Sequence, residues 1–215
     1  MPQLHKEAVR QLFDGLALEY AEGRDQQLSF RAQKHAVLQM LKGCEGRVLD
    51  VGCGPAVLEA DLLRRGHEVV GIDLSLEMLR FGLNRLAASP YRERCRLLPG
   101  DVERLEFADG AFDAVACMGV LEYLPSYTRA LREMRRVLRP GGVAVISTPN
   151  RVSAFHLNLA ALRLAKRILG RPAPAFIPNR CVPLLLDFQL RSEGFQILQR
   201  QRCGAQYIVK ARALP

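Results

Sequence analysis

The sequence lacks several features that mark large classes of protein. It has no run of about 18 apolar residues, so no membrane-spanning helix is predicted. Its first residues lack the apolar stretch of a signal peptide, so a cytoplasmic location is expected. It also has no internal repeats and no low-complexity tract. With 215 residues and 49% hydrophobic composition, a single globular domain spanning 1–215 is the natural expectation.

The sequence also lacks the spacing of a metal site. No C-x-x-C pair occurs among the six cysteines, and the four histidines are scattered. Free thiols without an export signal fit a reducing compartment. We therefore interpret the cysteines as small apolar core residues and predict no metal site.

A glycine turn lacks the third glycine of a dinucleotide-binding site. Residues 48–51 are typical of a buried parallel strand, and Gly52 and Gly54 follow at the predicted strand-to-helix turn. Val57 occupies the place of the third glycine. This absence argues against a protein that binds NAD.

Two carboxylates accompany this turn. Asp50 comes just before the glycines, where it would repel a pyrophosphate and attract an ammonium or sulfonium group. Asp73, 21 residues after Gly52, ends the next predicted strand and could accept both hydroxyls of a ribose. The combination favours S-adenosylmethionine (SAM) as the ligand.

Acidic residues are absent from residues 151–180, which carry six basic ones. Setting this segment aside lowers the net charge from +9 to +3. Such a charge suits nucleic acid or an anionic membrane surface. Because the basic residues alternate with leucines and not with aromatic residues that stack on bases, a nucleic-acid partner is disfavoured.

Five segments in order resemble the class I SAM-dependent methyltransferases, nearest to the ubiquinone-biosynthesis O-methyltransferase group. They read V-L-D-V-G-C-G, V-V-G-I-D-L-S, P-G-D-V-E-R-L-E-F, F-D-A-V-A-C-M-G-V-L-E-Y-L and L-R-P-G-G-V-A-V-I-S-T-P-N. The resemblance implies a doubly wound, Rossmann-like α/β fold with a seven-stranded sheet whose last strand is antiparallel. It divides the chain into a helical cap (1–43), a cofactor-binding core (44–150), a substrate lid (151–193) and closing strands (194–215).

Within these divisions, the sequence predicts helices at 29–41, 56–65, 76–88 and 183–193. It predicts strands at 68–73, 95–98, 112–118, 143–147, 195–201 and 206–210. Ser75 is expected to cap one helix, and Ser126 or Thr128 the helix that carries Leu131, Met134 and Leu138. Arg139 to Gly142 are expected to end that helix.

The resemblance also assigns a cofactor site. It implies that SAM, and its product S-adenosylhomocysteine (SAH), contact Tyr20, Asp50, Gly52, Cys53, Gly54, Asp73, Leu74, Asp101, Val102, Met118 and Gly119. Asp101 would accept from the adenine amino group, and Val102 would flank the ring. Tyr20 would close over the cofactor, although packing within a helix pair explains it equally well.

The catalytic residues are less defined. Glu122 and Tyr123 stand where many relatives carry Glu-His. Tyr123 is a poor base at neutral pH, because the reference pKa of tyrosine is about 10. Glu122 and His156 remain candidates for a general base, and a surface or packing role is an equal alternative for His156.

Residues 153–171 carry leucines together with Arg163, Lys166 and Arg167 on one helical face. This pairing predicts a substrate lid that also meets the inner face of a membrane, or else a helix packed in protein or a dimer interface. The expected function is SAM-dependent methyl transfer to a small or lipid-like acceptor, at oxygen, by a monomer or homodimer. The alternatives are an RNA methyltransferase and a non-catalytic SAM-binding protein.

Overall fold

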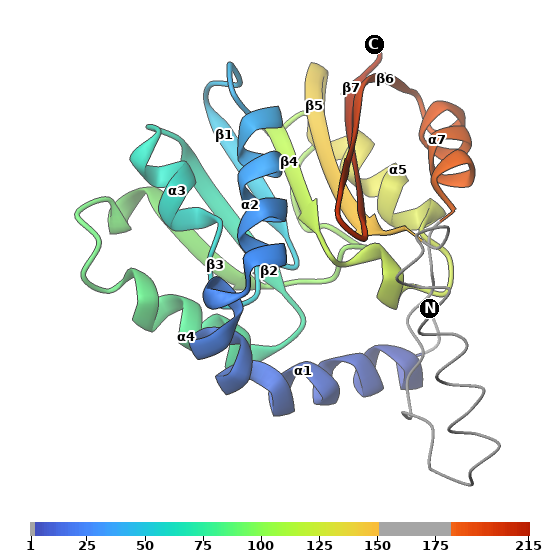
Figure 1. Cartoon of the computed structure of the whole chain (residues 1–215). Coiled ribbons are helices and arrows are strands. Elements are labelled where there is room, and N and C mark those ends of the chain that lie inside the picture. Colours follow the sequence, from blue (N-terminus) through green and yellow to red (C-terminus); the bar gives the residue numbers. More distant parts are fainter. Residues whose placement is uncertain (1–2, 151–181) are drawn as a thin grey trace, which may run out of the picture.

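The computed structural model describes residues 3–150 and 182–215, which form a seven-stranded sheet covered by helices on both faces (Figure 1). The strand order is β3-β2-β1-β4-β5-β7-β6. Strands β1 to β5 run parallel, and β7 is antiparallel to both β5 and β6. This arrangement confirms the predicted doubly wound fold with its antiparallel closing strand.

The central strands are buried on both faces, as expected for parallel strands covered by helices. Their side chains from Val48 to Val51 and from Val69 to Ile72 are buried. The strand bounds are β1 Arg47–Val51, β2 Glu68–Asp73, β3 Cys95–Pro99, β4 Phe112–Met118, β5 Leu138–Pro149, β6 Phe195–Cys203 and β7 Gln206–Ala213.

Two apolar clusters define the layers. One cluster joins the sheet to α2 (Leu28–Met40), α3 (Glu59–Arg64) and Leu86 of α4 (Leu76–Leu86). The other joins the opposite face to α5 (Thr128–Val137) and α7 (Pro183–Ser192). Each helix therefore buries one apolar stripe against the sheet.

Helix α1 (Gln3–Gly23) crosses below the carboxyl ends of the strands, as Figure 1 shows. The short 3₁₀ helix η1 (Arg24–Gln26) turns the chain from α1 into α2. Two polar contacts fix this region: Arg85 of α4 donates to Asp25 of η1 at 2.6 Å, and buried Gln33 of α2 donates to the Ser147 hydroxyl of β5 at 2.7 Å. The predicted helical cap is thus anchored to the body of the fold.

The closing hairpin is joined to α7 by a carboxylate. Asp187 is buried and accepts from the Tyr207 hydroxyl at 2.7 Å and from the Arg200 guanidinium at 2.6 Å. Burial raises the pKa of the Tyr207 hydroxyl, and its bond to Asp187 adds to the shift. This contact links one helix and two strands across the end of the sheet.

Several predicted boundaries were wrong, three of them at α3 and α5. The helix expected from Ala56 begins at Glu59, because the glycine turn continues through Ala56, whose φ is +55°. The next boundary lies at α5, which has Tyr127 at its N-cap without any side-chain capping bond, so neither Ser126 nor Thr128 caps it. Its C-terminal end differs too, because Leu138 belongs to β5.

Residues 139–142 do not lie in a separate loop. They lie within β5, whose pairing with β4 jumps from Phe112↔Leu138 to Ala114↔Val143. The extra residues form an irregularity in the strand with Gly141 at φ +80°. The Arg-Pro-Gly-Gly stretch therefore follows the end of the helix as part of the first residues of β5.

Five cysteines lie in the described part of the chain, and all are free thiols. Cys53, Cys95 and Cys117 are buried, whereas Cys44 and Cys203 are half-buried. Burial raises the pKa of Cys95 to about 12 and raises the pKa of Cys53 and Cys117 well above the usual range. Thiols in such surroundings pack as small apolar groups.

Candidate functional site

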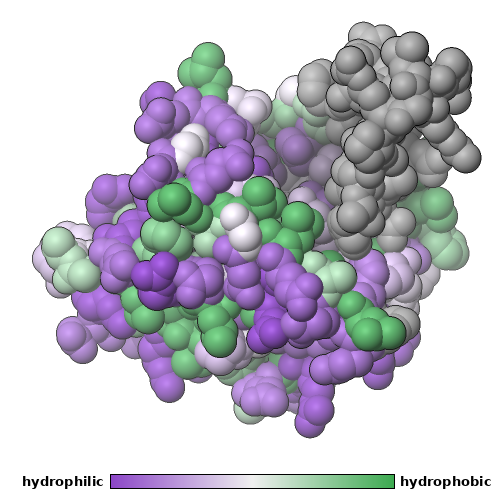
Figure 2. Space-filling view, turned by 90° about the horizontal axis from the view of Figure 1, so that it is seen from below, coloured by the Kyte–Doolittle hydropathy of each residue, from purple (hydrophilic) through white to green (hydrophobic). Residues whose placement is uncertain are grey.

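A cavity opens at the carboxyl edge of the sheet, between the strand ends and α1. The empty space measures about 1060 Å³, including the part open to solvent. Its lining comes from α1, η1, the turn after β1, the end of β2 and the loop after β4. Figure 2 views the molecule from this edge and shows apolar side chains interrupted by hydrophilic ones. Open α/β sheets bind ligands at this edge.

The turn after β1 forms the floor of the cavity. Gly52 and Gly54 have φ of +71° and +53°, which residues with a side chain rarely adopt. The N–H groups of Gly52 and Cys53 donate to the Ile72 carbonyl at 2.8 and 3.0 Å, which ties the turn to β2. A Cβ at Gly52 would overlap Val120 from the loop after β4. The absent side chain therefore lets two loops meet.

Asp73 connects the same turn to α4. Its Oδ2 accepts from the Gly54 N–H and its Oδ1 from the Ser75 N–H, both at 2.9 Å. Burial raises the pKa of Asp73, while these two bonds oppose the shift. Ser75 caps α4 as predicted, accepting from the Met78 N–H at 3.1 Å. Each carboxylate oxygen keeps a second lone pair that a ribose hydroxyl could use.

Asp50 lies in the cavity lining beside a residue that the sequence did not single out. Glu59, the first residue of α3, is fully buried and interacts with Asp50. Burial raises the pKa of both carboxyls, and the charge of Glu59 raises that of Asp50 further. Asp50 is thus one half of a buried acid pair.

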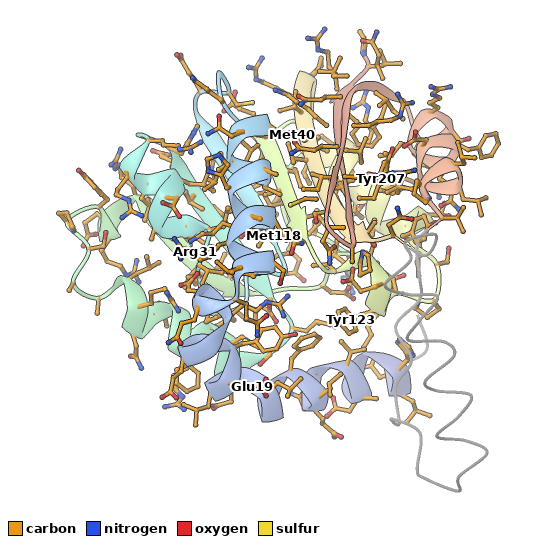
Figure 3. The ribbon with its side chains drawn as sticks, viewed as in Figure 1. Glu19, Arg31, Met40, Met118, Tyr123 and Tyr207 are labelled. Atoms are coloured by element: carbon orange, nitrogen blue, oxygen red, sulfur yellow. The ribbon has the colours of Figure 1, made fainter. Side chains whose placement is uncertain are left out.

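Aromatic rings form the wall toward α1. Phe13 meets Tyr20 and Tyr123 edge to face, with centroids 5.8 and 4.8 Å apart. Figure 3 shows Tyr123 between α1 and the strand ends. The Arg24 guanidinium stands 4.4 Å from the Tyr20 ring centroid and 4.8 Å from that of Phe30. Arg24 is the only basic side chain among the described residues that line the cavity.

Glu122 faces the cavity from the 3₁₀ helix η3 (Leu121–Tyr123). Burial raises its pKa to about 7, and the positive charge of Arg24 acts in the opposite direction. A carboxyl with such a pKa is near half-ionised at neutral pH and suits proton transfer. Burial raises the pKa of Tyr123 above its usual value, which weakens Tyr123 further as a base.

Asp101 lies outside the cavity. Its Oδ2 forms an ion pair with Lys6 of α1, and its Oδ1 accepts from the Glu103 N–H at 2.9 Å. Lys6 also approaches Glu103 at 3.3 Å. Asp101 lines a separate charged hollow, and Leu74 is the one described residue that lines both this hollow and the cavity. The role of Asp101 toward an adenine remains a prediction, and it would require Lys6 to share this carboxylate.

The cavity gathers most of the predicted residues. Its lining includes Tyr20, Asp50, Gly52, Cys53, Gly54, Asp73, Leu74, Val102, Met118, Gly119, Glu122 and Tyr123. His156 and the predicted lid at 153–171 lie outside the described residues. Sequence reasoning missed Glu59, Arg24 and Phe13, because nothing in the local pattern separates them from exposed helix residues.

Within residues 3–150 and 182–215, no three His, Cys, Asp or Glu side chains are placed to hold a metal ion. No helix in that same part of the chain is long and apolar enough to cross a bilayer.

Comparison with known proteins finds similarity in the region of the five quoted sequence segments. A family profile described as a methyltransferase domain matches residues 49–146. The malonyl-[acyl-carrier protein] O-methyltransferase of Erwinia pyrifoliae is 36% identical over 81% of this chain and 62% of its own length. The ubiquinone biosynthesis O-methyltransferase of Xanthomonas oryzae is 38% identical over 58% and 52%. The chain thus spans between half and two thirds of these two relatives.

A further relative covers more of its own length. The ubiquinone/menaquinone biosynthesis C-methyltransferase of Geotalea daltonii is 32% identical over 70% of this chain and 68% of its own. Among solved structures, magnesium protoporphyrin IX methyltransferase from Synechocystis, with bound SAH, superposes with a TM-score of 0.76 at 19% identity, covering 97% of this chain and 99% of its own. At that identity the likeness concerns the fold. The sequence relatives, the profile and the seven-stranded sheet together place this chain in the class I SAM-dependent methyltransferase family.

Proposed function

We propose that this chain transfers the methyl group of SAM to a small-molecule acceptor, at oxygen. The observation that carries the proposal is the single cavity in which the glycine turn and Asp73 meet Glu122. The turn and Asp73 suit the nucleoside end of SAM, and Glu122 lies on the loop after β4. Catalysis then rests mainly on holding the acceptor close to the methyl group.

The charges of the cavity complement the amino acid end of SAM. Asp50 offers a carboxyl for the ammonium group, and Arg24 offers a guanidinium for the carboxylate. The Arg24 guanidinium lies over the rings of Tyr20 and Phe30, and these contacts restrict the orientation of its N–H groups. Asp73 would accept from the ribose hydroxyls.

The acceptor would lie against Val9, Phe13 and Leu124, which give the cavity an apolar wall. This wall suits an aromatic or lipid-like molecule. SAM supplies an electrophilic methyl group on its sulfonium. When a hydroxyl oxygen forms the new bond to that carbon, sulfur keeps the electron pair of the broken bond, and the hydroxyl proton passes to Glu122. The rate of transfer should therefore rise with pH through about 7, as Glu122 loses its own proton.

Binding of SAM and SAH to metal-free protein is the first test, by isothermal titration calorimetry. Asp73→Asn removes the negative charge of the group that accepts hydrogen bonds from the ribose hydroxyls. This variant should weaken SAH binding by about 1–3 kcal/mol. Glu77→Gln is the control, because Glu77 is a carboxylate on α4 that is 44% exposed and, among the described residues, forms an ion pair only with Arg80. Absence of binding to the parent protein, or equal binding to both variants, would refute the assignment.

Turnover is the second test. Candidate phenols, quinols, carboxylic acids and amines are incubated with SAM, and the release of SAH is measured. We expect a phenol or quinol to react and Glu122→Gln to lower kcat by about 10²–10⁴-fold. Tyr123→Phe is the matched control and should keep most of the activity. Methylation of an amine alone would refute the oxygen acceptor.

A further inference from the structure

Asp50 and Glu59 form a pair of carboxyls whose environment offers little to stabilise two negative charges. Asp50 is 3% exposed and Glu59 is 0% exposed. Asp50 Oδ1 and both Glu59 carboxyl oxygens accept no hydrogen bond from a donor on any other described residue, and the two carboxyls interact with each other. The backbone N–H groups of Leu58 and Glu59 lower the pKa of the Glu59 carboxyl, but burial has the larger effect and raises it.

The backbone beneath the pair keeps Glu59 close to Asp50. A Cβ added to Gly71 of β2 would stand 2.7 Å from Glu59 Oε1 and 3.0 Å from the Cys53 Cβ. Gly71 is also the residue that pairs with Asp50 in the sheet. Glu59 therefore reaches from α3 over a glycine on the neighbouring strand, and the absent side chain makes room for its carboxyl.

The groups facing the pair are acids or thiols. They are Asp73 from β2, Cys53 from the turn, Cys95 from β3 and Cys117 from β4. The charge of Glu122 acts on Cys117 and that of Arg92 on Cys95, and neither residue is among the groups that shift the pKa of Asp50 or Glu59. No lysine or arginine in the described chain forms an ion pair with Asp50 or Glu59. Two ionised carboxylates buried side by side without a cation are unstable, so one proton stays between them.

We propose that Glu59 is a positioning residue that holds a shared proton on Asp50, and that the ammonium group of SAM or SAH displaces this proton to solvent. The ammonium then supplies the positive charge that the pair lacks. This inference rests on the proposed function, since it takes the amino acid end of SAM as the ligand of Asp50. The site therefore accepts a cationic amine by exchange for a proton.

The experiment compares two ligands that differ only in the amino acid part. SAH carries the ammonium, and 5′-deoxy-5′-methylthioadenosine does not. Calorimetry at pH 6.0 in buffers of different ionisation enthalpy counts the protons released on binding. At this pH the ammonium of SAH is fully protonated, because α-amino groups titrate near pH 7.7–8.0. We expect about one proton released with SAH and about none with methylthioadenosine.

The association constant of SAH should also rise about tenfold between pH 5.5 and 6.5, and that of methylthioadenosine should stay constant. Binding of SAH without proton release would overturn the inference and leave the proposed function intact. Absence of SAH binding would overturn both. These outcomes need only the parent protein.

Two isosteric variants locate the proton. Glu59→Gln can donate an amide N–H to an ionised Asp50, so proton release should fall by about one and the pH dependence should flatten. Glu122→Gln is the matched control, because Glu122 is a second buried glutamate and lines the same cavity as Asp50, and this variant should keep the release. If Glu59→Gln does not fold, Asp50→Asn removes the other half of the pair and should also abolish release. Loss of release in Glu122→Gln alone would assign the proton to Glu122 and refute the pair.

Discussion

Gly52 illustrates how one missing side chain holds two loops together. Gly52 has a φ of +71°, which alanine would have to adopt at this position, and the added Cβ would overlap Val120. We expect Gly52→Ala to lower the free energy of unfolding by about 1–3 kcal/mol, from backbone strain and from this overlap. Urea unfolding measures the change.

The control for Gly52→Ala is Gly54→Ala, which carries comparable strain but has Met78 Sδ as its nearest neighbour, at 3.9 Å. Gly54→Ala should cost less than Gly52→Ala. Adding Val120→Ala to Gly52→Ala should recover part of the loss. A double variant no more stable than Gly52→Ala would show that the Val120 overlap is not the cause.

Two acidic residues show what could be predicted at this scale. Asp73 was predicted because it ends an apolar strand at a fixed distance from the glycines, and the structure places it in the cavity. Glu59 was not, because an acidic residue in the first turn of a helix usually faces solvent near the helix N-terminus. The burial of Glu59 depends on the turn continuing through Ala56, and the sequence gives no signal for the positive φ of Ala56.

Helix α1 is held at the cavity by polar contacts at several points. Lys6 pairs with Asp101 and Glu103, a His5 ring nitrogen contacts the Tyr123 carbonyl at 2.9 Å, and the Ser75 hydroxyl donates to Asp14 at 2.6 Å. Removing one contact should loosen the first half of the helix without unfolding the protein.

We expect Lys6→Met to speed hydrogen exchange of the amides in residues 5–13 several-fold, with α2 unaffected. The free energy of unfolding should change by less than about 1 kcal/mol, because the ion pairs of Lys6 are partly solvated. Arg10→Met is the control, since Arg10 forms its ion pair among the described residues within α1, with Glu7. Equal exchange in both variants would show that Lys6 does not restrain the helix.

At the element scale, the strands were easier to predict than the boundaries between helices and strands. Buried parallel strands are apolar along their length, so β1, β2 and β4 were recognisable. The irregularity in β5 arises from pairing with β4, which joins residues far apart in sequence. Local turn residues could not reveal that pairing.

The buried acids make the stability of the whole molecule depend on pH. The pKa of Glu122 is raised to about 7, so the folded protein keeps a proton that the unfolded chain loses near pH 4.3. Stability from such a group is present below the unfolded pKa and is lost as pH rises through the folded pKa. Between these values the free energy of unfolding should fall by about 1.4 kcal/mol per pH unit per proton.

Urea unfolding of the ligand-free protein at pH 5, 6 and 7 tests this expectation. Glu122→Gln should reduce the fall in the free energy of unfolding with pH by the amount that corresponds to about one proton. Glu68→Gln, which removes an exposed carboxylate at the start of β2, should leave the slope unchanged. A parent protein that gains stability over this range would contradict the prediction.

The fold class of the molecule could be predicted because the five sequence segments lie at the parallel strands of the sheet, in the order typical of the family. The placement of α1 across the cavity could not be derived in the same way. It depends on contacts such as that of Lys6 with Asp101, which lie 95 residues apart. The same holds for Arg24, whose stacking on Tyr20 and Phe30 needs the bend at η1.

The cysteines lie at different places in the sheet, so the rate at which each thiol is labelled reports on local opening of the structure. Cys53, Cys95 and Cys117 lie on the turn after β1, on β3 and on β4. A cysteine reacts with an alkylating reagent as the thiolate, which is the nucleophile. Among the five cysteines of the described residues, mass spectrometry should therefore find Cys44 and Cys203 labelled first and the three buried thiols only as the sheet opens. Bound SAH should slow the labelling of Cys53, which lines the cavity, more than that of Cys95, which does not. Labelling rates would then record, thiol by thiol, which part of the molecule opens and whether the cavity is filled when it does.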